Sequence, residues 1–94
     1  MGEDGHTASL FPGNRSSEQS LSNNKIELVC TEAPVHPTRR ISCSKELIIQ
    51  SKQLDLLIVG ETKKEVLEKA IPSNLPIAIV ARQSAELTVF YSPQ

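Results

Sequence analysis

Apolar residues are grouped into short runs along the chain, and this grouping predicts aliphatic strands separated by helical segments. Candidate strands lie at 26–30, 40–44, 77–81 and 87–91. The clearest strand is Leu54–Val59, where the apolar run is nearly continuous. A run of this kind is typical of a strand buried on both faces, as in a parallel sheet.

Three further segments carry helix or loop signals. Ser44 is a suitable N-cap for a helix extending to about Lys52. Thr62-Lys-Lys-Glu65 has the form of a capping box, and Pro72 would end the helix that this box opens. Residues 14–24 are mostly Ser, Asn, Gln and charged residues, which predict an exposed loop or a weak surface helix.

The alternation of strands and helices predicts an α/β fold with a mainly parallel sheet. A sheet of this kind is difficult to complete within 94 residues, because the helices cannot cover both of its faces. We therefore expect at least one aliphatic strand edge without a neighbour, and such an edge invites pairing with another chain.

Composition and charge narrow the class of protein. Ten Lys and Arg residues nearly balance eleven Asp and Glu residues, so no electrostatic footprint for nucleic acid or a membrane surface is present. No stretch approaches the roughly 18 apolar residues of a membrane-spanning helix. Cys30 and Cys43 are expected to be reduced thiols, and two Cys with two His show no zinc spacing. These features predict a soluble cytoplasmic protein without a metal or cofactor.

The strongest candidate for chemistry lies near the start of the chain. Asp4 and His6 flank Gly5, where the backbone can turn tightly and bring both side chains together. A carboxylate beside an imidazole fixes the tautomer of the histidine and allows it to act as a general base. A solvated turn is the alternative interpretation, since Asp and Gly are common turn residues.

Two basic positions are candidates for binding an anion. The turn from Gly60 to Lys63 leads from a strand into a helix N-terminus, where unpaired N–H groups favour negative charge. Arg40, at the start of a predicted strand, could form a bidentate contact with a phosphate or carboxylate. For both residues the alternative is an ordinary solvated side chain.

The first thirteen residues, Met1-Gly-Glu-Asp-Gly-His-Thr-Ala-Ser-Leu-Phe-Pro-Gly13, resemble the signature of the 6-phosphogluconolactonases, in the wider group with the glucosamine-6-phosphate deaminases. Further points of resemblance are Pro37 to Ser42, Gly60 to Lys63, and Leu75-Pro76. The resemblance covers the whole chain but only the C-terminal two-fifths or so of a family member. It implies the C-terminal part of a three-layer αβα, Rossmann-like fold with a mostly parallel sheet. Residues 1–24 would form the catalytic loop and a polar surface segment, and residues 25–94 the alternating strands and helices.

The resemblance implies metal-free hydrolysis of 6-phosphoglucono-δ-lactone to 6-phosphogluconate in the oxidative pentose phosphate pathway. By position, His6 matches the proposed general base and Asp4 its acidic partner. Lys63 matches the phosphate-contacting lysine, and Arg40 an arginine typical of the lactonases. Together with Gly5, these two basic residues form the expected substrate-binding set.

Departures from the family pattern leave other functions to consider. Phe11 stands where the deaminase relatives carry a carboxylate, which disfavours an amino-sugar-phosphate isomerase or deaminase. Ile49 stands where the family has an Asn, so a non-catalytic sugar-phosphate-binding module is a second alternative. The family site also uses an N-terminal half. We therefore expect little activity from this chain alone, with that half or a self-association partner as its possible complement.

Overall fold

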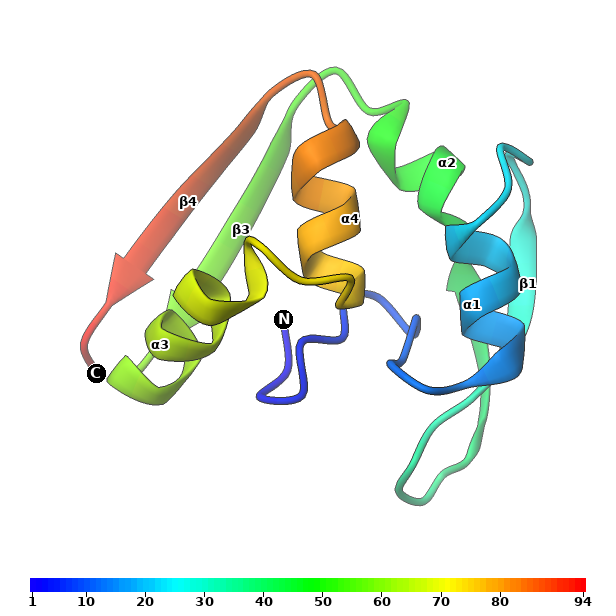
Figure 1. Ribbon diagram of the computed structural model, residues 1–94, viewed down its shortest axis with the longest axis horizontal. Coiled ribbons are helices and arrows are strands. Elements are labelled where there is room, and N and C mark those ends of the chain that lie inside the picture. Colours follow the sequence, from blue (N-terminus) through cyan, green and yellow to red (C-terminus); the bar gives the residue numbers. More distant parts are fainter.

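Two small sheets lie on opposite sides of a central helix in the computed structural model, which describes residues 1–94 (Figure 1). Strands β1 (Leu28–Glu32) and β2 (Arg39–Cys43) form an antiparallel hairpin, whereas β3 (Leu54–Val59) and β4 (Leu87–Ser92) pair in parallel. The helices are α1 (Arg15–Leu21), α2 (Lys45–Ile49), α3 (Glu61–Ala70) and α4 (Pro76–Gln83). The fold is thus mixed α/β with one parallel pair, rather than a single mostly parallel sheet between two helical layers.

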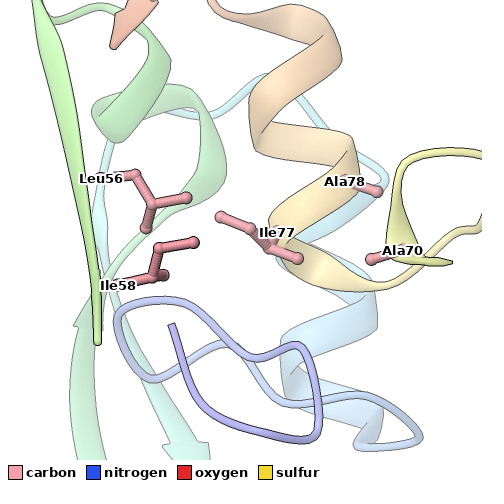
Figure 2. Close-up of a cluster of buried hydrophobic side chains, with 5 residues drawn as sticks. All are labelled: Leu56, Ile58, Ala70, Ile77 and Ala78. Carbon is pink, nitrogen blue, oxygen red and sulfur yellow. The ribbon is translucent and has the colours of Figure 1, made fainter. Parts of the chain in front are cut away.

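The main hydrophobic cluster joins β3 to the two helices that follow it. Leu56 and Ile58 point from β3 toward Ile77 of α4, and Ala70 of α3 lies beside Ala78 (Figure 2). All five side chains are at most 7% exposed. Alanines at the contact between α3 and α4 allow the two helices to approach closely, and both helices cover the same face of β3.

The expectation that both faces of β3 are buried is wrong. Exposure alternates along the strand, with Leu56 and Ile58 buried but Leu57 70% and Val59 51% exposed. Successive side chains of a strand point to opposite faces, and only the face toward α3 and α4 is covered within this chain. The nearly continuous apolar sequence therefore belongs to a strand with one bare apolar face.

The predicted strand at 77–81 is also wrong, because these residues lie in helix α4. Pro76 occupies the first turn of the helix, where its missing N–H has no cost and its fixed φ favours helical geometry. Ile77, Ala78 and Val80 form the buried stripe. A run of five apolar residues fits a strand and a buried helix equally well, so the preceding proline was the more informative signal.

Helix α3 begins earlier than the predicted capping box would place it. Gly60 is the N-cap, no side chain caps the helix, and Thr62 already lies within the first turn. The Gly60 amide donates to the Ser92 carbonyl at 2.8 Å. The φ of Gly60, +96°, turns the chain directly from β3 into the helix. A side-chain cap at Thr62 is therefore not formed. The helix ends at Ala70, two residues before Pro72, as expected.

The remaining elements agree with the sequence to within a few residues. Strand β1 lies two residues later than expected, and β2 one residue earlier. The side chain of Ser44 caps α2 by accepting from the Leu47 amide, although this helix ends at Ile49 rather than near Lys52. The polar segment 14–24 contains α1, of which Ser17, Ser20 and Leu21 are buried. No helix of the chain has the length and apolar character needed to cross a membrane.

Candidate active site

The loop that carries Asp4 and His6 is closed on itself by two backbone hydrogen bonds. The Gly2 amide donates to the His6 carbonyl, and the Gly5 amide donates to the Gly2 carbonyl, both at 3.0 Å. Gly5 has φ +84° and is buried, and its carbonyl accepts from the Ile77 amide at the start of α4. A Cβ atom at Gly5 would lie 2.9 Å from the Leu75 side chain. Glycine is therefore required here both by the positive φ and by the lack of space for a side chain.

Within this loop, Asp4 and His6 form the pair that the sequence predicts. Oδ1 of Asp4 lies 2.5 Å from Nδ1 of His6 and also accepts from the His6 amide at 3.0 Å. The side chains are 38% and 33% exposed, so the pair is reachable from outside. Burial raises the pKa of the Asp4 carboxyl, but the hydrogen bonds and charge of His6 outweigh this effect and lower it below its usual value.

The His6 imidazole also contacts an aromatic ring. The ring centroids of His6 and Phe11 lie 4.7 Å apart with an interplanar angle of 41°. Phe11 is only 4% exposed, and the guanidinium carbon of Arg40 lies 5.8 Å from its ring centroid. Arg40 is the second residue of β2 and donates from Nε to the Pro37 carbonyl at 2.6 Å. Phe11 therefore packs near both His6 and Arg40.

Buried hydroxyl groups attach the rest of the loop to the hairpin and to α1. Thr31 of β1 donates to the Ser9 carbonyl at 2.6 Å, and Ser42 of β2 accepts from the Ser9 amide at 3.0 Å. The Phe11 amide donates to the Ser17 hydroxyl at 2.9 Å. Each of these three hydroxyl-bearing residues is at most 4% exposed. Because buried hydrogen bonds are costly to break, they fix the position of the loop.

Lys63 is carried by α3, whereas Arg40 is carried by the hairpin. It lies in the first turn of α3, a helix whose N-terminus has no side-chain cap. It forms no ion pair with Asp4, and no hydrogen bond joins it to His6. Burial and the positive charge of Lys63 together lower the pKa of the Met1 amino group, which places the lysine near the beginning of the loop.

The structure thus brings Asp4, Gly5 and His6 together in one turn, with Arg40 beyond Phe11 and Lys63 beside Met1. Asp4, Gly5 and His6 line none of the concave surfaces of the chain, although Arg40 lines one of them and Phe11 another. No cluster of His, Cys, Asp or Glu side chains suited to holding a metal ion is formed. The Asp4–His6 pair is therefore partly exposed on the surface of the chain.

Sequence reasoning missed several residues that shape this site. A side chain at Gly2 would overlap the His6 ring, and the spacing of two glycines around Asp4 was the available signal. The aromatic support from Phe11 and the hydroxyl contacts of Thr31 and Ser42 join residues far apart in sequence. Nothing in the local pattern marks such long-range contacts.

Comparisons with known proteins identify the family of the chain. The chain matches the family described as glucosamine-6-phosphate isomerases/6-phosphogluconolactonase over residues 1–89. The 6-phosphogluconolactonase of Helicobacter pylori is 40% identical over 97 residues, covering 98% of this chain and 41% of that protein. The human GDH/6PGL endoplasmic bifunctional protein is 37% identical over 92 residues, covering 93% of this chain and 11% of that protein.

A solved structure of a 6-phosphogluconolactonase has a similar fold. The crystal structure of a 6-phosphogluconolactonase from Shewanella baltica OS155 superimposes with a TM-score of 0.81 at 36% identity. The match covers 98% of this chain and 41% of that chain. The chain therefore spans about two-fifths of the length of the lactonases that it matches, and within that length it keeps their fold. On these grounds, the chain belongs to the glucosamine-6-phosphate isomerase/6-phosphogluconolactonase family.

Proposed function

We propose that this chain contributes the general base of a 6-phosphogluconolactonase, which hydrolyses 6-phosphoglucono-δ-lactone to 6-phosphogluconate. The observation that carries the proposal is the Asp4–His6 pair, held at 2.5 Å in a loop closed by its own backbone. A carboxylate on Nδ1 keeps the proton on that nitrogen and leaves the lone pair of Nε2 free to accept a proton.

In the proposed reaction, Nε2 of His6 removes a proton from a water molecule as its oxygen attacks the lactone carbonyl carbon. The tetrahedral intermediate then collapses, the bond between this carbon and the ring oxygen breaks, and His6 returns the proton to the departing oxygen. Asp4 is the positioning residue, because it orients the imidazole and stabilises its protonated form. Phe11 supports the other face of the ring.

The basic residues are assigned to the substrate's anionic end. The first-turn N–H groups of α3 and the ammonium of Lys63 are proposed to bind the 6-phosphate, since a helix N-terminus favours an anion. Arg40, half-buried over Phe11, would contact a phosphate or an oxygen of the sugar acid. Gly5, which matches the family's motif by position, would contribute through its backbone, whose φ of +84° shapes the turn that carries Asp4 and His6.

A hydrolase is favoured over an isomerase or deaminase by one contact. The deaminase relatives place a carboxylate where this chain has Phe11, and here that position is filled by a buried ring packed against His6. No second carboxylate is therefore available on that side of the imidazole to assist ring opening of an amino sugar.

A single-chain chimera, in which this chain replaces the matching segment of the Helicobacter pylori lactonase, tests the assignment of reaction class. We expect the chimera to form 6-phosphogluconate from freshly generated lactone faster than the spontaneous rate. It should release no ammonia from glucosamine 6-phosphate. Ammonia release without lactone hydrolysis would assign the chain to the isomerase branch. Binding of 6-phosphogluconate without either reaction would indicate a non-catalytic sugar-phosphate-binding module.

A further inference from the structure

Arg82, in the last turn of α4, is bonded to the segment that enters this helix from α3. Its Nη1 group donates to the carbonyls of Ile71, at 3.0 Å, and Ser73, at 2.7 Å. Its Nη2 group donates to Oδ1 of Asn74 at 3.4 Å. We call residues 71–75, between the two helices, the α3–α4 linker. Arg82 forms no ion pair, so all the contacts of its guanidinium are with this linker.

These hydrogen bonds set the path of a linker that has no regular secondary structure of its own. Ile71 is the C-cap of α3, and the carbonyls at a helix C-terminus have no partner within the helix. The Ser73 hydroxyl donates to the Ala70 carbonyl at 2.6 Å and accepts from the Leu75 amide at 3.2 Å. A guanidinium is a planar fork with fixed donor directions, so one arginine holds several acceptors in a single geometry. Arg82 therefore fixes the backbone that leads into Leu75.

The linker ends against the turn that carries Asp4 and His6. The Leu75 side chain lies 2.9 Å from the place that a Cβ atom of Gly5 would occupy. The Gly5 carbonyl accepts from the Ile77 amide, at the start of α4, at 3.0 Å. In Figure 1, the linker enters α4 at the end of the helix where the N-terminal loop lies. A displacement of the linker would therefore be passed directly to the turn, because no space separates the two.

We propose that Arg82 is a positioning residue for the Asp4–His6 pair. It fixes the α3–α4 linker, the linker places Leu75, and Leu75 with the start of α4 holds the turn at Gly5. The guanidinium contacts only the linker, so its loss should alter the orientation of the pair rather than the affinity for substrate. The expected effect on rate rests on the function proposed for His6, whereas the effect on the geometry of the pair does not.

Arg82→Met tests the proposal, because it removes the three hydrogen bonds and keeps an unbranched apolar side chain. In this chain, the ring signals of His6 in the NMR spectrum should shift. In the chimera, kcat for the lactone should fall at least about fivefold while KM stays within about twofold, because a small misplacement of a reacting group slows the chemical step. Arg82→Lys keeps donors for the two carbonyls but loses the fork, so it should retain more of kcat and shift the His6 signals less.

Two control variants separate positioning from a general loss of stability or charge. Lys69→Met removes an exposed positive charge from α3 that forms no ion pair. Ser84→Ala removes a hydrogen bond to the Val80 carbonyl, at 2.5 Å, from the opposite end of α4. Neither change should shift the His6 signals or lower kcat, although Ser84→Ala should lower the melting temperature.

Unchanged His6 signals in folded Arg82→Met would overturn the proposal. If Arg82→Met does not fold, unchanged signals and unchanged kcat in Arg82→Lys would overturn it in the same way. An equal shift in Ser84→Ala would also overturn it, because any loosening of α4 would then have the same effect. The proposed function fails separately, if the chimera with His6→Ala keeps its full rate. A shift of the His6 signals in Arg82→Met would still support the link between Arg82 and the turn in that case.

Discussion

The rings of His6 and Phe11 are in contact, with their centroids 4.7 Å apart, and Phe11 is almost completely buried. The candidate base is thus held between a carboxylate on one ring nitrogen and an aromatic ring against one face. This combination limits how the imidazole can tilt, so that orientation is fixed before a substrate binds.

Replacing Phe11 by Leu should release that constraint. We expect the free energy of unfolding to fall by about 1–2 kcal/mol, from lost packing and lost ring–ring contact. The ring protons of His6 should also shift in the NMR spectrum, because the neighbouring aromatic ring is gone. Phe90→Leu is the matched control, since Phe90 is half-exposed in β4 and the ring in contact with His6 is that of Phe11. Unchanged His6 signals in Phe11→Leu would argue against a positioning role.

Gly5 and Gly13 form a natural pair for testing the loop geometry. Both have positive φ, at +84° and +70°, but a side chain at Gly13 would meet nothing within 4 Å. Gly13→Ala should therefore lower the free energy of unfolding by only about 1 kcal/mol, the cost of placing a side chain in a left-handed backbone conformation. Gly5→Ala should lower the free energy of unfolding by more than this, because the Leu75 side chain must also move. The additional change Leu75→Ala in the Gly5→Ala protein would relieve this overlap. If chemical denaturation shows the same loss of unfolding free energy for both glycine variants, the close packing around Gly5 would be contradicted.

The lowered pKa of Asp4 predicts how stability depends on acid. A carboxyl whose pKa is lowered in the folded state stabilises the protein at pH values above its unfolded pKa of about 3.8. That contribution is lost as the pH falls through the lower folded pKa. The difference in melting temperature between the natural protein and Asp4→Asn should therefore be present at pH 6 and disappear under strongly acidic conditions. Glu3→Gln, an exposed neighbour with the same charge change, is the matched control.

Lys63 and Lys64 are adjacent in α3, and the charge of Lys63 helps to lower the pKa of the Met1 amino group. Lys64 instead lies over the Tyr91 ring, 5.2 Å from its centroid. In the chimera, Lys63→Ala should weaken binding of 6-phosphogluconate by about 1–3 kcal/mol, the range for one charge-assisted hydrogen bond. Lys64→Ala should leave that affinity nearly unchanged. If isothermal titration shows the same change in affinity for both substitutions, Lys63 would be an ordinary solvated lysine without a role in phosphate binding.

The sequence predicted best where local signals decide the structure. Strand β3 has the expected bounds because its apolar run is closed by Gly60, and Asp4 meets His6 because only one residue separates them. Helix α4 was missed because a short apolar run fits either element. The link of Arg40 to His6 through Phe11 spans the fold, so the chain had to be folded before the contact could be seen.

The hydrolysis rate of the chimera with and without His6 is the most direct measurement of the central claim. Freshly generated 6-phosphoglucono-δ-lactone is supplied, and formation of 6-phosphogluconate is followed with the spontaneous rate subtracted. Removing a general base typically lowers a rate by about 10²–10⁴-fold, and His6→Ala should lower kcat by that amount while the protein remains folded. A folded His6→Ala protein that retains the full rate would contradict the account, because the Asp4–His6 pair would then have no part in the reaction.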